Sequence, residues 1–242
     1  PGERLQRDLA GPLRQIEFAF VNVSLTGNQV AGAINIGIEP GLRDVLAPAL
    51  LEQIAAEEPG IVPRITEGAA EHLGEWAVRG DIDLVIFSGP SPDEAIIDRG
   101  LLTEDLWLAG SPESDLAPNS PVRFSVATAL PLILPEGRSG VVPILEKLAY
   151  VNKASLNVVN RVNSFELLKQ MVGKGLGYSV LPKSAVEREL RDGRIALWPI
   201  IDPVLTQSIS IGATRDCKVP RLVERTDIII RHALAGLVSS GA

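Results

Sequence analysis

The chain has 242 residues, of which 45% are hydrophobic and 22% charged, as is ordinary for a soluble globular protein. Its formal net charge of -7 argues against a protein that grips the phosphate backbone of nucleic acid by itself. The length accommodates one large α/β unit or two lobes of about 100 residues each.

Two kinds of feature that the sequence lacks indicate the cellular compartment in which we expect the protein. No apolar run reaches the length of a membrane span, and no secretory signal is present in the sequence as given. Cys217 is the single cysteine, so no internal disulfide is possible. We therefore expect a protein of the reducing cytoplasm.

The first predicted element is a helix over residues 4–24, with apolar residues at alternating spacings of four and three. This stripe predicts packing against a second helix, as in a coiled coil, and burial against the chain's own body is the alternative. Pro12 predicts a kink or a break. The stripe consists of Leu9, Leu13, Ile16, Phe20 and Val23.

Strands and helices are predicted to alternate along the rest of the chain, which favours parallel sheets with helical crossovers. The first series has strands at 33–38, 61–66 and 81–87 and helices at 46–54 and 72–78. The polar run at 111–120 is predicted to be a surface loop that marks the transition to a second series. That series has strands at 131–134, 156–162, 176–181, 195–200 and 208–213, and helices at 141–150, 164–172, 183–190 and 222–238.

One helix-to-strand unit, residues 162–182, organises the second series. Ser164 occupies the predicted N-cap, and Gly173 and Gly175 end the helix. These glycines do not form a dinucleotide-binding fingerprint, which needs strand, glycines and helix in that order.

This unit, N-S-F-E-L-L-K-Q-M-V-G-K-G-L-G-Y-S-V-L-P, resembles a signature near the end of the effector-binding domain of LysR-type transcriptional regulators. Residues 32–37, 80–86 and 130–135 resemble three strands of that domain, and residues 1–5 resemble the start of the family's linker. The motifs occur in the family's order across essentially the whole chain.

The resemblance implies an α/β fold with two Rossmann-like lobes, similar to type II periplasmic binding proteins, preceded by a linker helix. The implied boundaries are 1–29 for the linker and dimerisation helix, 30–103 with 206–242 for regulatory subdomain I, and 104–205 for regulatory subdomain II. The DNA-binding domain is expected to be absent from this chain.

Catalytic and metal-binding chemistry find little support in the sequence. His72 and His232 lie in separate predicted helices, so the histidines and Cys217 form no zinc-like spacing. Residues 137–140 and 177–180 each approach G-x-S-x-G without completing it, and Ser179 lies within a predicted strand. We expect no enzyme activity, no metal and no cofactor.

An effector site is predicted beyond the carboxyl ends of the strands, where loops lead into helices. The alternative is that each of these residues is an ordinary cap or turn. By the resemblance and this rule, the candidate effector-binding residues are Glu39, Pro40, Gly41, Ala69, Ser88, Pro135, Glu136, Gly137, Arg138, Ser139, Asn163 and Ser164.

The charge of the effector is left open by these loops. Many family members have Ser or Thr where this chain has Pro40, Gly41 and Ala69, so hydroxyl donors for a carboxylate are missing there. Arg138 is the candidate anchor for an acidic effector. Glutamates at 39, 67 and 136 make the rim partly acidic, which also permits an amine-bearing or neutral effector.

The resemblance predicts the ligand-sensing and oligomerisation domain of a LysR-type transcriptional regulator. A small-molecule effector between two lobes would modulate DNA binding and transcription allosterically. The chain would form a dimer or tetramer, and would contact DNA only through the missing N-terminal domain. The alternative function is a solute-binding protein of a transport system.

Overall fold

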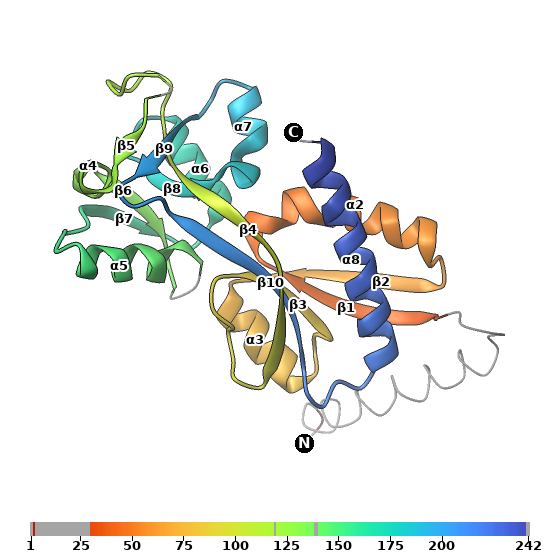
Figure 1. The fold of residues 1–242 in the computed structure, drawn as a ribbon. Helices are drawn as coiled ribbons and strands as arrows, with labels where there is room; N and C mark the ends of the chain where they lie inside the picture. The colour runs from red at the N-terminus through yellow and green to blue at the C-terminus, as the bar shows by residue number, and fades with distance from the viewer. Residues whose placement is uncertain (1, 3–29, 119, 138–139, 241–242) are drawn as a thin grey trace. The chain divides into compact units, whose positions relative to one another are not determined.

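The computed structural model describes residues 2, 30–118, 120–137 and 140–240, with side chains as far as residue 234 (Figure 1). The helix predicted over residues 4–24, its apolar stripe and the kink at Pro12 lie outside the described residues. The chain divides into two compact units. The first comprises residues up to Phe87, Ser91–Leu101 and the chain from Ser210, and the second comprises Ser88–Pro90 and Leu102–Ile209.

The first unit is built on strands β1 (Gly32–Ile38), β2 (Ile61–Glu67) and β3 (Leu84–Ser88). β1 lies between β2 and β3 and pairs with both in parallel. β10 (Thr206–Thr214) follows β3 in the sheet, and β4 (Ile96–Gly110) follows β10. These last two strands each run from one unit into the other.

Helices cover both faces of the sheet in the first unit (Figure 1). A Cβ at Gly37 of β1 would meet Leu73 of α3 (Ala70–Arg79), so the odd-numbered residues of β1 face α3. The isoleucines at 34, 36 and 38 therefore face the other side and are fully buried. On that side α2 (Pro40–Glu57) packs against α8 (Pro220–Ser240).

The second unit combines antiparallel and parallel pairing. β4 pairs antiparallel with β8 (Ser179–Pro182) and with β9 (Ala196–Ile201), and β9 pairs in parallel with β5 (Val122–Arg123). β6 (Leu132–Pro135) and β7 (Val158–Val162) form a parallel pair, and Leu132 bridges to Tyr178 just before β8. The helices are α4 (Phe124–Ala129), α5 (Val141–Val151), α6 (Phe165–Gly173), the 3-10 turn η1 (Lys183–Val186) and α7 (Glu187–Arg191).

Two hydrophobic clusters form the core of the second unit. α6 contributes Leu168 and Val172 to a cluster that also contains Ile133 of β6 and Ile195. The other cluster is centred on residues of β4, α4, β6, α5 and β9. Helices therefore pack against both faces of the β6–β7 pair, and this packing fixes the position of the strand ends.

Most predicted elements are present, and the structure differs from the predictions in four places. The strand predicted from Leu176 begins only at Ser179, and Leu176 itself is 57% exposed. The helix predicted over 183–190 is a 3-10 turn followed by a short α-helix. β4, β5 and α4 were not predicted at all. The loop at 111–120 lies within the second unit, because the chain changes unit inside β4, after Leu101.

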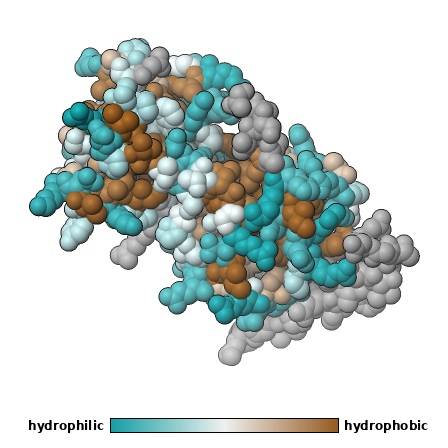
Figure 2. Space-filling model, viewed as in Figure 1, coloured by the Kyte–Doolittle hydropathy of each residue, from teal (hydrophilic) through white to brown (hydrophobic). Residues whose placement is uncertain are grey.

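No helix in the described part of the chain is long and apolar enough to cross a membrane. On the face drawn in Figure 2, hydrophilic residues are spread over both units.

Candidate functional site

The three parallel strands of the first unit end at one edge of the sheet, and this edge carries the predicted residues Glu39, Pro40, Gly41 and Ala69. Ile38 at the end of β1 is in register with Glu67 of β2 and with Ile86 of β3. Gly68 N donates to Ile38 O at 3.3 Å, and Glu39 N donates to Ile86 O at 3.3 Å. The loops after β1 and β2 therefore lie side by side, and they lead into the first turns of α2 and α3.

Neither helix at this edge is capped by a side chain. Glu39 and Ala69 hold the N-cap positions of α2 and α3, and neither makes a side-chain cap hydrogen bond. Pro40 stands at the start of α2, where a missing N–H costs nothing. Helix N-termini carry partial positive charge and favour negative groups nearby. Two such ends are brought together at the edge of this unit.

One arginine near this edge was not singled out from the sequence. Arg43 in the first turns of α2 forms an ion pair with Glu67 and donates from Nε to Asp44 Oδ1 at 2.7 Å. The hydrogen bonds to Asp44 and then to Glu67 raise the pKa of Arg43 above its ordinary value. Arg43 carries one positive charge against the two negative charges of Glu67 and Asp44, so it offsets the expected acidity of the rim only in part. Because the ends of parallel strands bring the residues after β1 and β2 together, this ion pair could have been predicted from the sequence.

The predicted residues of the second unit also lie together. Pro135 at the end of β6 is in register with Val162 at the end of β7, and Glu136 N donates to Val162 O at 2.8 Å. The loop through Glu136 and Gly137 therefore runs beside Asn163 and Ser164. Arg138 and Ser139 lie outside the described residues.

Ser88 lies next to the same loop. A Cβ at Gly140, the N-cap residue of α5, would be 3.4 Å from Ser88 Oγ. Gly89 N donates to Ser208 O at 2.8 Å, which fixes the turn after β3. Ser88 is buried and belongs to the second unit. The predicted residues thus form two groups, one at each unit's strand ends.

Ser164 has the predicted capping role. Its side chain accepts a hydrogen bond from Leu167 N at 3.3 Å at the start of α6. The prediction of an N-cap at this position is confirmed.

Replacing Ser164 with alanine is expected to lower the free energy of unfolding by about 1 kcal/mol, because a backbone N–H of the first turn loses its acceptor. Urea denaturation followed by circular dichroism measures this change. Ser125, exposed on α4 with its side chain in no cap, is the matched position, and Ser125→Ala should change stability by less than about 0.5 kcal/mol. Equal effects of the two substitutions would contradict a capping role for Ser164.

Two charged side chains of the second unit, the half-buried Glu104 and the buried Lys169, were not anticipated. Glu104 of β4 accepts hydrogen bonds from Ser184 Oγ at 2.6 Å and from Gln207 Nε2 at 2.7 Å, and burial raises the pKa of this carboxyl. Lys169 of α6 is 5% exposed and pairs with Glu189. Neither lies in a strand-end loop, and no pattern in the sequence marks a charged residue for burial.

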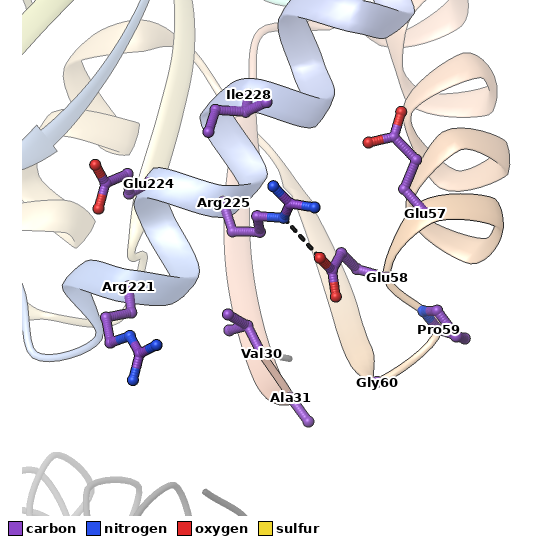
Figure 3. A pocket seen from close by; sticks show the side chains of 10 residues that line it. All are labelled: Val30, Ala31, Glu57, Glu58, Pro59, Gly60, Arg221, Glu224, Arg225 and Ile228. Carbon is purple, nitrogen blue, oxygen red and sulfur yellow. Dashed lines mark hydrogen bonds and ion pairs between the residues drawn. The ribbon is translucent and has the colours of Figure 1, made fainter. Parts of the chain in front are cut away.

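A hollow of about 660 Å³ lies in the first unit at the opposite edge from the predicted residues (Figure 3). It is bounded by the start of β1 at Val30 and Ala31, by the end of α2 at Glu58, and by α8. Arg225 Nε donates to Glu58 Oε1 at 2.6 Å across it, as the dashed line in Figure 3 marks. Since it lies at the amino ends of the strands, it is separate from the strand-end loops.

The residues considered for catalysis or metal binding have other surroundings. His72 stacks on Trp76 with ring centroids 6.0 Å apart, and His232 Nδ1 lies 3.0 Å from Glu57 Oε1. Ser179 is fully buried, and its hydroxyl has no hydrogen-bond partner, so no base activates it. Among the described residues, no three His, Cys, Asp or Glu side chains gather so that they could hold a metal ion.

Two α/β units, in which parallel strands run directly into helices, place the chain in the class of periplasmic-binding-protein-like folds, as predicted. The chain belongs to the family described as LysR substrate binding domain, whose model matches residues 27–229.

Among curated relatives, the HTH-type transcriptional regulator BbuR of Bordetella bronchiseptica is 28% identical over 194 residues, which cover 80% of this chain and 60% of the relative. The nitrogen assimilation regulatory protein nac of Klebsiella aerogenes is 27% identical over 83% of this chain and 65% of its own length. The chain therefore spans less than two thirds of the length of these relatives.

Solved structures agree on the fold. The OxyR C206 mutant of Corynebacterium glutamicum superposes with a TM-score of 0.78 at 21% identity, covering 98% of this chain and 75% of that one. A protein described as a putative LysR family transcriptional regulator from Pseudomonas aeruginosa gives a TM-score of 0.73 at 20% identity, covering 96% of this chain and 81% of that one.

Proposed function

We propose that this chain is the ligand-sensing and oligomerisation part of a LysR-type transcriptional regulator. A small-molecule effector bound at the strand-end loops would bias the arrangement of the oligomer and so modulate DNA binding and transcription. The observation that best supports this proposal is that helices start immediately after the parallel strands, at the predicted residues. These residues lie within the family match over 27–229. DNA contact would be made by a part of the regulator outside this chain, in the cytoplasm.

The proposed effector site uses both groups of loop residues. Glu39, Pro40, Gly41 and Ala69 would contribute from the first unit, and residues at the ends of β6 and β7, together with Ser88, from the second. Ser88 and Asn163 supply polar side chains beside helix N-termini.

An anionic effector, such as a carboxylate, is favoured by the charges. The uncapped N-termini of α2 and α3 lie at one group of loop residues, and Arg43 there offsets part of the negative charge of Glu67 and Asp44. Gly137 and Gly140 have positive φ angles of 106° and 62°, and because neither has a side chain a ligand can approach their backbone closely. Arg138 would supply the full positive charge.

Self-association is also part of the proposal. The stripe of Leu9, Leu13, Ile16 and Phe20 predicts a helix that pairs with its copy, giving a dimer or a tetramer. A transport role would use the same fold, but the curated relatives BbuR and nac are named as regulatory proteins.

Substituting Arg138 by alanine is expected to weaken binding of an anionic effector by about 1.5–3 kcal/mol, because a charge-assisted hydrogen bond is lost. A metabolite screen by thermal shift identifies the effector, and calorimetry then measures affinity for the original chain and the variant. Arg123, exposed in the same unit, is the matched control, and Arg123→Ala should leave affinity unchanged. Unchanged affinity in Arg138→Ala would remove this arginine from the site. Failure of every metabolite to bind would count against the ligand-sensing function itself.

A further inference from the structure

A second hollow, of about 490 Å³, lies wholly within the second unit. Its walls are the loop at 111–113 after β4, one face of α6 from Glu166 onwards, and α7 with the turn that follows it. A Cβ at Gly173 would be 2.9 Å from Arg194 O, so the backbones of α6 and of that turn approach each other closely. The volume falls within the range of small-molecule sites.

Two opposite charges are buried in its wall. Lys169 and Glu189 have side chains 5% and 6% exposed, and Lys169 Nζ lies 3.1 Å from Glu189 Oε1. The same ammonium lies 3.2 Å from Glu166 Oε2. The other carboxylate oxygen of Glu189, Oε2, is buried and has no hydrogen-bond partner in the structure. Leaving a charged oxygen without a donor costs free energy, so additional positive charge near Glu189 is favourable.

The surroundings of Glu189 favour a positively charged donor. α6 ends at Gly173 beside the hollow, so the negative end of its dipole lies there. Glu166 and Glu113 also line the hollow. An ammonium group is therefore better suited to Glu189 than a neutral hydroxyl.

The rim of the hollow carries the opposite charge. Lys174 and Arg194 both line it and are exposed. Lys174 forms no ion pair with any residue that the structure describes. Arg194 NH2 lies 2.9 Å from Asp192 Oδ2 and 3.8 Å from Glu189 Oε1. Lys174 in particular is available to a carboxylate.

We propose that this hollow is a second ligand site, which binds a small zwitterionic molecule of the α-amino acid type. The ligand's ammonium group lies against the carboxylates of Glu189 and Glu166, which line the hollow, and its carboxylate pairs with Lys174 and Arg194. None of the candidate effector-binding residues that the structure describes lines this hollow, so it is distinct from the proposed effector site. It stands independently of the proposed function.

Titration calorimetry of the chain with each proteinogenic L-α-amino acid tests the site. At least one is expected to bind, and its N-acetylated form, which lacks the ammonium, is expected not to. Glu189→Gln and Lys174→Met should each raise Kd about tenfold, as for the loss of one charge-assisted contact. Lys147, exposed on α5 in the same unit, gives the matched control, and Lys147→Met should leave Kd unchanged.

Three outcomes would overturn the proposal. One is the absence of binding by every amino acid, and a second is binding that neither Glu189→Gln nor Lys174→Met weakens. The third is binding that Asn163→Ala abolishes and Lys174→Met leaves intact, which would assign the ligand to the strand-end loops. If Glu189→Gln fails to fold, the exposed variants Lys174→Met and Arg194→Met decide alone.

Discussion

Phe87→Ala is expected to lower the free energy of unfolding of the first unit by about 3–5 kcal/mol, the cost of emptying a buried aromatic site. Phe87 lies at the end of β3, is fully buried, and packs in a cluster with Leu73, Val85 and Ile96. Hydrogen exchange followed by mass spectrometry measures the loss separately in each unit, which is necessary because the chain has two units and need not unfold in one step.

A matched position in the same unit separates cavity formation from a general effect of truncation. Val78 on α3 is 50% exposed, and Val78→Ala should cost less than about 0.5 kcal/mol. A loss of less than about 1 kcal/mol in Phe87→Ala would show that the cluster collapses into the space, contrary to the expectation. Since Ser88 follows directly, we also expect the variant to weaken effector binding if the proposed site is correct.

Elements with a strong local signal were predictable. The helix of residues 165–173 has its apolar positions, its cap at Ser164 and its stop at Gly173 close together in the sequence, and the structure has all three. β1, β2 and α5 likewise carry patterns that need no knowledge of their partners.

β4 was missed because its pattern depends on tertiary context. Its first half, Ile96–Leu101, contains Asp98, Arg99 and Gly100, which are exposed and indicate a loop. Its second half, Leu106–Ala109, is mostly buried and pairs with β8 and β9. A strand whose environment changes along its length has no single period, so sequence reasoning divides it or loses it.

The candidate site was predictable in part for a topological reason. Parallel strands bring their carboxyl ends to one edge, so Glu39 was expected near Ala69, and Glu136 near Asn163, and the structure places them so. Which charges neutralise one another there depends on side-chain geometry, and the pairing of Arg43 with Glu67 was missed for this reason. The buried pair of Lys169 and Glu189 joins α6 to α7 through space, and no spacing in the sequence encodes it.

Lys169→Met is expected to lower the free energy of unfolding of the second unit by about 3 kcal/mol. Methionine keeps the aliphatic stem and removes the ammonium, which leaves Glu189 buried without its partner at 3.1 Å. The lower end of the usual range applies because Arg194 NH2, 3.8 Å from Glu189 Oε1, compensates in part. Urea denaturation of the two proteins measures the difference, and Lys147→Met on the surface of α5 should show almost none.

A double variant and a pH series test the cause of that loss. Lys169→Met combined with Glu189→Leu should recover most of the stability, since no unpaired charge then remains buried. Burial by itself lowers the pKa of Lys169, but the hydrogen bonds to Glu189 and Glu166 outweigh it and hold the pKa above its ordinary value. The contribution of Lys169 should therefore be complete below about pH 10.4, the ordinary lysine pKa, and be lost as the pH rises through the folded-state pKa. If the difference in free energy of unfolding between the original chain and Lys169→Met stays constant through that pH range, packing of the aliphatic stem, and not the ion pair, supplies the stability.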